Sequence, residues 1–94
     1  ESLLKEYLTS TPSLLKNLEY QCQTDDLDEA KMTAHTIKGS SLSLGFEQVG
    51  TAARHLETML KTGAIEGVPS GLRVLRHAEA QAEESIRSFL EADR

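Results

Sequence analysis

Apolar side chains recur along this chain at spacings of three and four residues, which is the period of one face of an α-helix. Four stretches show the pattern, and segments marked by glycine, proline or paired aspartates separate them. None of the stretches alternates apolar and polar residues as a strand does. The expected helices cover residues 3–22, 27–44, 46–61 and 70–91.

The residues at the helix ends support these boundaries. Asp25 and Asp26 suit the N-cap of the second helix, and Gly45 suits its C-terminal end. Thr11 followed by Pro12 leaves two alternatives open in the first stretch. A helix could begin there, after a short extra N-terminal helix, or the proline could kink one long helix.

Each expected helix carries one apolar stripe, and the stripe of the last helix extends to Phe89 and Leu90. Ninety-four residues are enough for one domain and too few for two. Four amphipathic helices with short connections bury their stripes most simply by packing against one another. We therefore expect residues 1–94 to form a single all-α domain, an antiparallel up-and-down four-helix bundle.

The charge balance narrows the class of partner. Fifteen Asp and Glu against ten Lys and Arg give a net charge of -5, the wrong sign for binding nucleic acid or an anionic membrane through a net-charge field. The only cysteine, Cys22, allows no internal disulfide and no cysteine metal cage. Without a signal peptide or a membrane span, we expect a cytoplasmic protein. The chain begins at Glu1 rather than methionine, which suggests either a trimmed chain or a domain of a longer protein.

One part of the second expected helix departs from a purely structural pattern. Gly39 lies in its middle, where glycine costs about 1 kcal/mol relative to alanine. At 100° per residue, His35, Lys38, Gly39 and Leu42 share a face roughly opposite Ile37, and that face is expected to be exposed. An exposed imidazole beside bare backbone is accessible to another protein surface.

The segment that contains these residues, AHTIKGSSLSLGF at 34–46, resembles the signature of histidine-containing phosphotransfer (HPt) domains, including those that begin chemotaxis histidine kinases. The expected bundle and the chain length also agree with that family. The resemblance implies a phosphoryl carrier in a two-component phosphorelay, with His35 as the phosphorylated residue and no ATP site of its own. In chemotaxis-type members a glutamate 22 residues after the histidine contacts the ring, and that offset leads to Glu57.

These residue types suit the chemistry. A carboxylate that accepts a hydrogen bond from Nδ1–H of His35 fixes the tautomer and leaves Nε2 as the nucleophile. Glu57 can serve if the second and third helices are antiparallel neighbours. Lys38, one turn from His35, could stabilise the oxygens of the phosphoryl group. Glu57 could instead form an ordinary i to i+4 ion pair with Lys61.

The expected partners are a response-regulator receiver domain and a histidine kinase catalytic or receiver domain, between which His35 would carry the phosphoryl group. Mg²⁺ is expected in the partner, and no cofactor or metal on this chain. Lys31, Arg54 and Lys61 are expected to surround the histidine with positive charge that complements a receiver's acidic pocket, while Leu42 adds an apolar contact.

Other interpretations explain less of the sequence. His55 and His77 lack supporting neighbours and are expected to be solvated, and three histidines on three helices are a poor zinc pattern. An autonomous kinase would need a glycine-rich phosphate loop and Mg²⁺ carboxylates, which the sequence lacks. The alternative of a different class is a helical interaction or dimerisation module without phosphotransfer chemistry.

Overall fold

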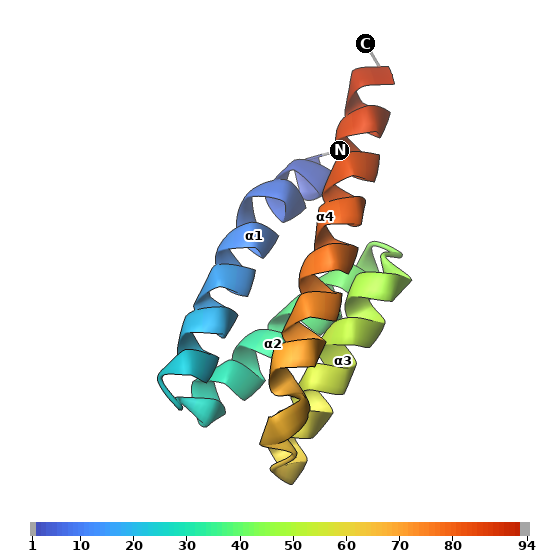
Figure 1. Cartoon of the computed structure of the whole chain (residues 1–94). Helices are drawn as coiled ribbons and strands as arrows, with labels where there is room; N and C mark the ends of the chain where they lie inside the picture. The colour runs from blue at the N-terminus through green and yellow to red at the C-terminus, as the bar shows by residue number, and fades with distance from the viewer. Residues whose placement is uncertain (1, 93–94) are drawn as a thin grey trace.

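A computed structural model describes residues 2–92 and is helical through almost all of that range (Figure 1). The all-α prediction is confirmed. The elements are α1 (Ser2–Gln23), α2 (Leu27–Ser43), α3 (Glu47–Thr62), the 3-10 helix η1 (Ile65–Gly67) and α4 (Val68–Ala92).

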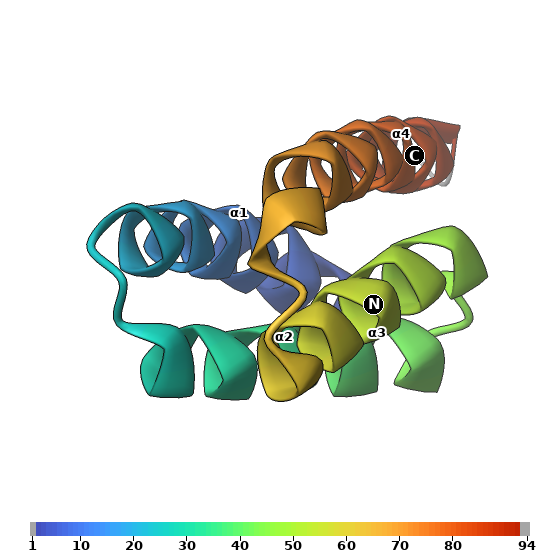
Figure 2. The same ribbon diagram turned by 60° about the horizontal axis from the view of Figure 1, so that its bottom comes forward.

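The four α-helices pack as a bundle in which each helix touches two neighbours. Close backbone contacts join α1 to α2, α2 to α3, α3 to α4, and α4 back to α1, whereas the backbones of the diagonal pairs lie further apart within residues 2–92. Figure 2 shows this arrangement nearly end-on, with α1 and α4 on one side and α2 and α3 on the other. The short connections make consecutive helices antiparallel, which confirms the predicted bundle. Its principal-axis extents are 46 × 18 × 17 Å.

The core is built from the predicted apolar stripes of all four helices. Leu18, Ile37, Leu56 and Leu75, one from each helix, are fully buried. The expectation that Phe89 faces the core is wrong, because its side chain is 55% exposed. Leu90, the next residue, packs partly buried against the core, so the apolar stripe continues there and Phe89 lies outside it. The C-terminal end of α4 extends past the other helices (Figure 1).

The region around Pro12 resolves the choice left open by the sequence. α1 is a single helix with Pro12 inside it, and no separate N-terminal helix precedes that proline within the described part of the chain. Thr11 is buried in the helix and is not an N-cap. The reason is packing, since Tyr7 before the proline and Leu15 after it lie in the same core.

The helix ends agree with the predicted boundaries to within two residues. Asp26 is the N-cap of α2, although its side chain makes no capping hydrogen bond. Gly45 and Gly63, which end α2 and α3, have φ of +87° and +82°, a conformation that favours glycine. α4 begins two residues earlier than expected, at Val68.

None of the helices between residues 2 and 92 has both the length and the apolar content needed to cross a membrane.

Candidate functional site

His35 lies in the middle of α2 with its ring turned outward. Its neighbours Ala34 and Ile37 are completely buried, and they fix the rotation of the helix against the core. The His35 side chain is consequently 64% exposed. Because successive residues point in different directions around a helix, Ala34 and Ile37 can be buried while His35 between them is accessible.

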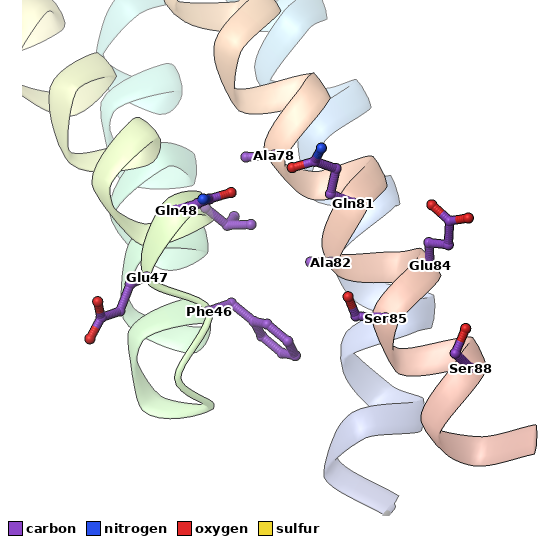
Figure 3. Close-up of a pocket in the computed structure, with 10 residues that line it drawn as sticks. Phe46, Glu47, Gln48, Ala78, Gln81, Ala82, Glu84, Ser85 and Ser88 are labelled. Atoms are coloured by element: carbon purple, nitrogen blue, oxygen red, sulfur yellow. The ribbon is translucent and has the colours of Figure 1, made fainter. Parts of the chain in front are cut away.

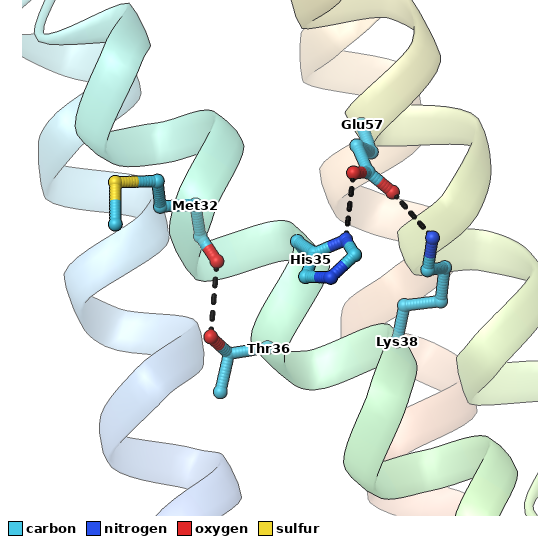
Figure 4. Close-up of polar contacts among 5 residues, drawn as sticks. All are labelled: Met32, His35, Thr36, Lys38 and Glu57. Atoms are coloured by element: carbon cyan, nitrogen blue, oxygen red, sulfur yellow. Dashed lines mark hydrogen bonds and ion pairs between the residues drawn. The ribbon is translucent and has the colours of Figure 1, made fainter.

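Glu57 of α3 reaches the His35 ring across the contact between the two helices. Its Oε2 lies 2.9 Å from His35 Nδ1, and its Oε1 lies 2.9 Å from Lys38 Nζ (Figure 4). The antiparallel turn at Gly45 brings this part of α3 beside the middle of α2. Only 12% of the Glu57 side chain is exposed, so the carboxylate lies between its two partners.

The electrostatics of this contact keep Glu57 ionised. The hydrogen bond from Lys38 is the largest influence and lowers the pKa of Glu57, and the hydrogen bond from His35 acts in the same direction. Partial burial opposes them, but the net effect is a pKa below the usual range. The carboxylate of Glu57 therefore pairs with Lys38 and His35, rather than with Lys61, the alternative that the sequence allowed.

A negative carboxylate next to Nδ1 determines the tautomer of the ring. The carboxylate can only accept a hydrogen bond, so Nδ1 carries the proton and donates a hydrogen bond to Glu57. The lone pair then resides on Nε2, the nitrogen not bonded to Glu57 in Figure 4. The arrangement can hold an exposed imidazole in the orientation and tautomer suited to nucleophilic attack.

Gly39 is exposed one turn beyond His35, and packing does not require it. A Cβ atom at Gly39 would meet nothing within 4 Å. Gly50 and Gly71 differ, because a Cβ there would overlap Leu42 and Leu56 respectively. The absence of a side chain at Gly39 leaves open space beside His35 and serves no contact inside the bundle.

The structure leaves the other predicted site residues outside the contact between His35, Lys38 and Glu57. Lys31 lies one turn before His35, with its Nζ 3.9 Å from Asp28 Oδ1. Arg54 and Lys61 are exposed on α3, three residues before and four residues after Glu57. Leu42 remains partly exposed while its side chain rests over Gly50 of α3.

Met32 is a neighbour of His35 that the sequence analysis missed. Its side chain is 63% exposed, one turn before His35. In Figure 4, Met32 and Thr36 lie on the side of α2 away from Glu57, and Thr36 Oγ1 donates to the Met32 carbonyl at 3.0 Å. A methionine three residues before the histidine was the available signal, since that spacing leads back to nearly the same face.

The grooves of the bundle lie elsewhere. One, of about 790 Å³, runs between α1 and α2 and includes Thr36 and Ser40. Another, of about 700 Å³, lies between the start of α3 and the second half of α4, with Phe46 and Ala82 in its lining (Figure 3). His35 lines neither groove. The site is an exposed surface.

The remaining histidines lie apart from this site. His55 and His77 are exposed and border a groove between α3 and α4. Within residues 2–92, no group of three or more His, Cys, Asp or Glu side chains is arranged to hold a metal ion.

One family model matches most of the chain. The family model described as the Hpt domain matches residues 2–85, which include the first three helices and most of α4. No curated protein and no solved structure gave a significant match.

Proposed function

Because the chain belongs to the Hpt domain family, whose members transfer phosphoryl groups through histidine in phosphorelays, we propose that His35 is the residue that carries the phosphoryl group. One observation supports the assignment above the others. His35 combines a 64% exposed ring with an ionised Glu57 on Nδ1, so Nε2 is both accessible and nucleophilic.

The transfer is a displacement at phosphorus. The Nε2 lone pair attacks the phosphoryl group of an aspartyl phosphate on a receiver domain, a P–N bond forms, the P–O bond breaks, and the aspartate leaves as a carboxylate. With a kinase domain as donor, the leaving group is ADP. The Nδ1 proton stays on the ring, which becomes positively charged, and Glu57 stabilises that charge. Transfer to a second receiver reverses these steps.

Lys38 acts in this proposal chiefly through Glu57. Its Nζ holds one carboxylate oxygen while the other faces His35. The same cation lies one turn from His35, where it also favours the negative phosphoryl oxygens. Lys38 is therefore a positioning residue before transfer and an electrostatic one after it.

The partner is a receiver domain that brings its own Mg²⁺ to the shared site. A receiver that reaches Nε2 must cover the surface within about two turns of His35, because a typical interface buries roughly 800 Å² on each side. The open space at Gly39 and the apolar Met32 and Leu42 lie in that area. We place Lys31, Arg54 and Lys61 at its charged rim, and the whole exchange in the cytoplasm.

Charge reversal tests this docking surface. The double variant Lys31→Glu, Lys61→Glu should slow transfer from a phosphorylated receiver at low salt and leave the circular dichroism spectrum unchanged. The reaction of His35 with phosphoramidate, a small phosphodonor that needs no docking, should keep its rate. Unchanged transfer from the receiver at low salt would reject these residues as the rim.

A labelling experiment tests the function itself. The chain is incubated with a receiver domain carrying ³²P on its aspartate, and the label on the chain should be acid-labile and alkali-stable. His35→Gln should remove it, whereas His55→Gln and His77→Gln, two matched controls on α3 and α4, should retain it. Absence of label on the unaltered chain across a panel of receivers and kinase domains, or label that survives His35→Gln, would favour an interaction or dimerisation module.

A further inference from the structure

Glu79 is a buried acidic residue on α4 that the proposed phosphotransfer does not use. The residue is only 5% exposed, whereas Glu84 on the same helix is exposed. Its Oε2 is buried and has no hydrogen-bond partner within the described part of the chain. A buried carboxylate in this state is costly, so the group needs either a proton or water.

The surroundings of Glu79 favour the proton. Glu83 lies one turn further along α4, and its own nearest cation is Arg87, whose Nη2 lies 3.6 Å from Glu83 Oε1. From α1, the Tyr7 hydroxyl lies close enough to be influenced by both glutamates. From α3, the grooves along this stretch of α4 contain the uncharged Val49 and Ala52, and also the charged Glu47 and the titratable His55.

Burial and the adjacent Glu83 raise the pKa of Glu79 to about 8, although Arg87 acts in the opposite direction. At neutral pH the two carboxyl groups therefore share one proton, and one group donates to the other. Above that pH both carry a negative charge, about one helical turn apart and poorly hydrated.

This carboxyl pair lies where the bundle is packed least. Among the four neighbouring helix pairs, α1 and α4 have the smallest interface, and no turn connects them. Tyr7 is 3% exposed and forms a 2.7 Å hydrogen bond between its hydroxyl and Ser41 Oγ on α2, the helix of His35. A change at the interface between α1 and α4 can thus reach α2 through Tyr7.

We propose that the proton shared by Glu79 and Glu83 keeps α1 packed on α4, and that its loss opens this interface while α2, α3 and the rest of α4 stay together. The physical reason is that two ionised carboxylates repel and require water, which enters most easily where the interface is smallest.

Amide hydrogen exchange of the unphosphorylated chain, corrected for the intrinsic rate, tests the proposal. Between pH 6 and pH 8 the opening equilibrium of α1 should rise by up to roughly 100-fold, because each pH unit between the two pKa values of Glu79 contributes about tenfold. Glu79→Gln should abolish the rise. Glu84→Gln, an exposed neighbour on α4, should retain it.

A second measurement serves if Glu79→Gln does not fold. In the unaltered chain, the side-chain carboxyl carbon of Glu79 should titrate near pH 8 by NMR. Titration below pH 5.5, or an equal rise of exchange in α3, would overturn the proposal, because the first removes the shared proton and the second indicates global unfolding. Neither result bears on whether His35 is phosphorylated.

Discussion

Glu57 and Glu79 are glutamates on adjacent helices in opposite electrostatic situations. Glu57 lies at the edge of the bundle between Lys38 and His35, and the pKa of its carboxyl is lowered. Glu79 lies between α1 and α4 beside another glutamate, and the pKa of its carboxyl is raised to about 8. One is expected to be ionised and the other protonated at neutral pH.

The difference shows that partners, rather than burial alone, decide the state of a carboxyl group. Burial raises the pKa of both glutamates. For Glu57, two donors outweigh burial and maintain a charge that can stabilise a charged ring. For Glu79, a second carboxyl adds to the effect of burial. The bundle thus keeps a charge at its proposed reactive surface and avoids one in its interior.

The pH dependence of unfolding should show the largest effect and have opposite signs at the two sites. The raised pKa of Glu79 means that stability is lost as pH rises from about 4.5 towards 8. The lowered pKa of Glu57 means that stability is lost as pH falls below 4.5, through its folded pKa. Between pH 5 and pH 8, Glu79→Gln should gain on the order of 3 kcal/mol in unfolding free energy relative to the unaltered chain.

Urea denaturation of the two variants at several pH values measures both effects. Between pH 5 and pH 8 the unfolding free energy of Glu57→Gln should differ from that of the unaltered chain by a constant amount. This difference should disappear only in acid, where Glu57 is protonated. If the two variants have parallel pH profiles, the contrast between the glutamates is wrong.

The rate of phosphoryl transfer should depend on Glu57 and not on Glu79. Glu57→Gln retains an oxygen that accepts from Nδ1–H but supplies no negative charge to the ring that forms on phosphorylation. We expect acceptance from a phosphorylated receiver to fall roughly 10- to 100-fold. Glu79→Gln, measured at pH 6.5, should keep the unaltered rate. Equal rates for both variants would remove Glu57 from the site.

Replacing Lys38 should raise the pKa of Glu57 and so bring it closer to that of Glu79. In Lys38→Met the carboxylate loses the donor that contributes most to its lowered pKa, so that pKa should rise. We expect the transfer rate to fall about tenfold, because a carboxylate without its Lys38 partner holds the ring less firmly. An NMR titration of Glu57 and the transfer rate measure the two effects. Lys38→Arg, which keeps the charge, should restore both, and an unshifted Glu57 titration in Lys38→Met would contradict the positioning role.

Much of the fold follows from the spacing of apolar residues. The period of 3.6 residues predicts the four helices, because each stripe must be buried against another. It does not predict the fate of Phe89 or Glu79. Phe89 is exposed although the adjacent Leu90 packs against the core, and Glu79 is buried next to the core residue Ala78. Both outcomes depend on how α4 is rotated against its neighbours, a property of the assembled bundle.

The sequence predicted some contacts of the candidate site and not others. The offset from His35 to Glu57 indicates a contact across two helices, and the atoms lie 2.9 Å apart. That Glu57 also binds Lys38 depends on side-chain reach, which spacing on one helix does not define. Met32 was missed because an exposed methionine has no distinctive pattern until the rotation of the helix is known. The roles of these residues in transfer stay predictions.

The smallest expected effect concerns Gly39, where the space beside His35 rather than a charge is tested. Because a Cβ there meets open space, Gly39→Ala should stabilise the chain by about 0.5–1 kcal/mol, the helix propensity of alanine over glycine. Gly50→Ala is the matched control and should destabilise it, since its Cβ overlaps Leu42. Gly39→Gln should keep the helical circular dichroism signal and the reaction with phosphoramidate, yet slow transfer from a receiver. Unimpaired transfer to Gly39→Gln would mean that the open space is not needed for access, and the glycine would then have no explanation in either stability or docking.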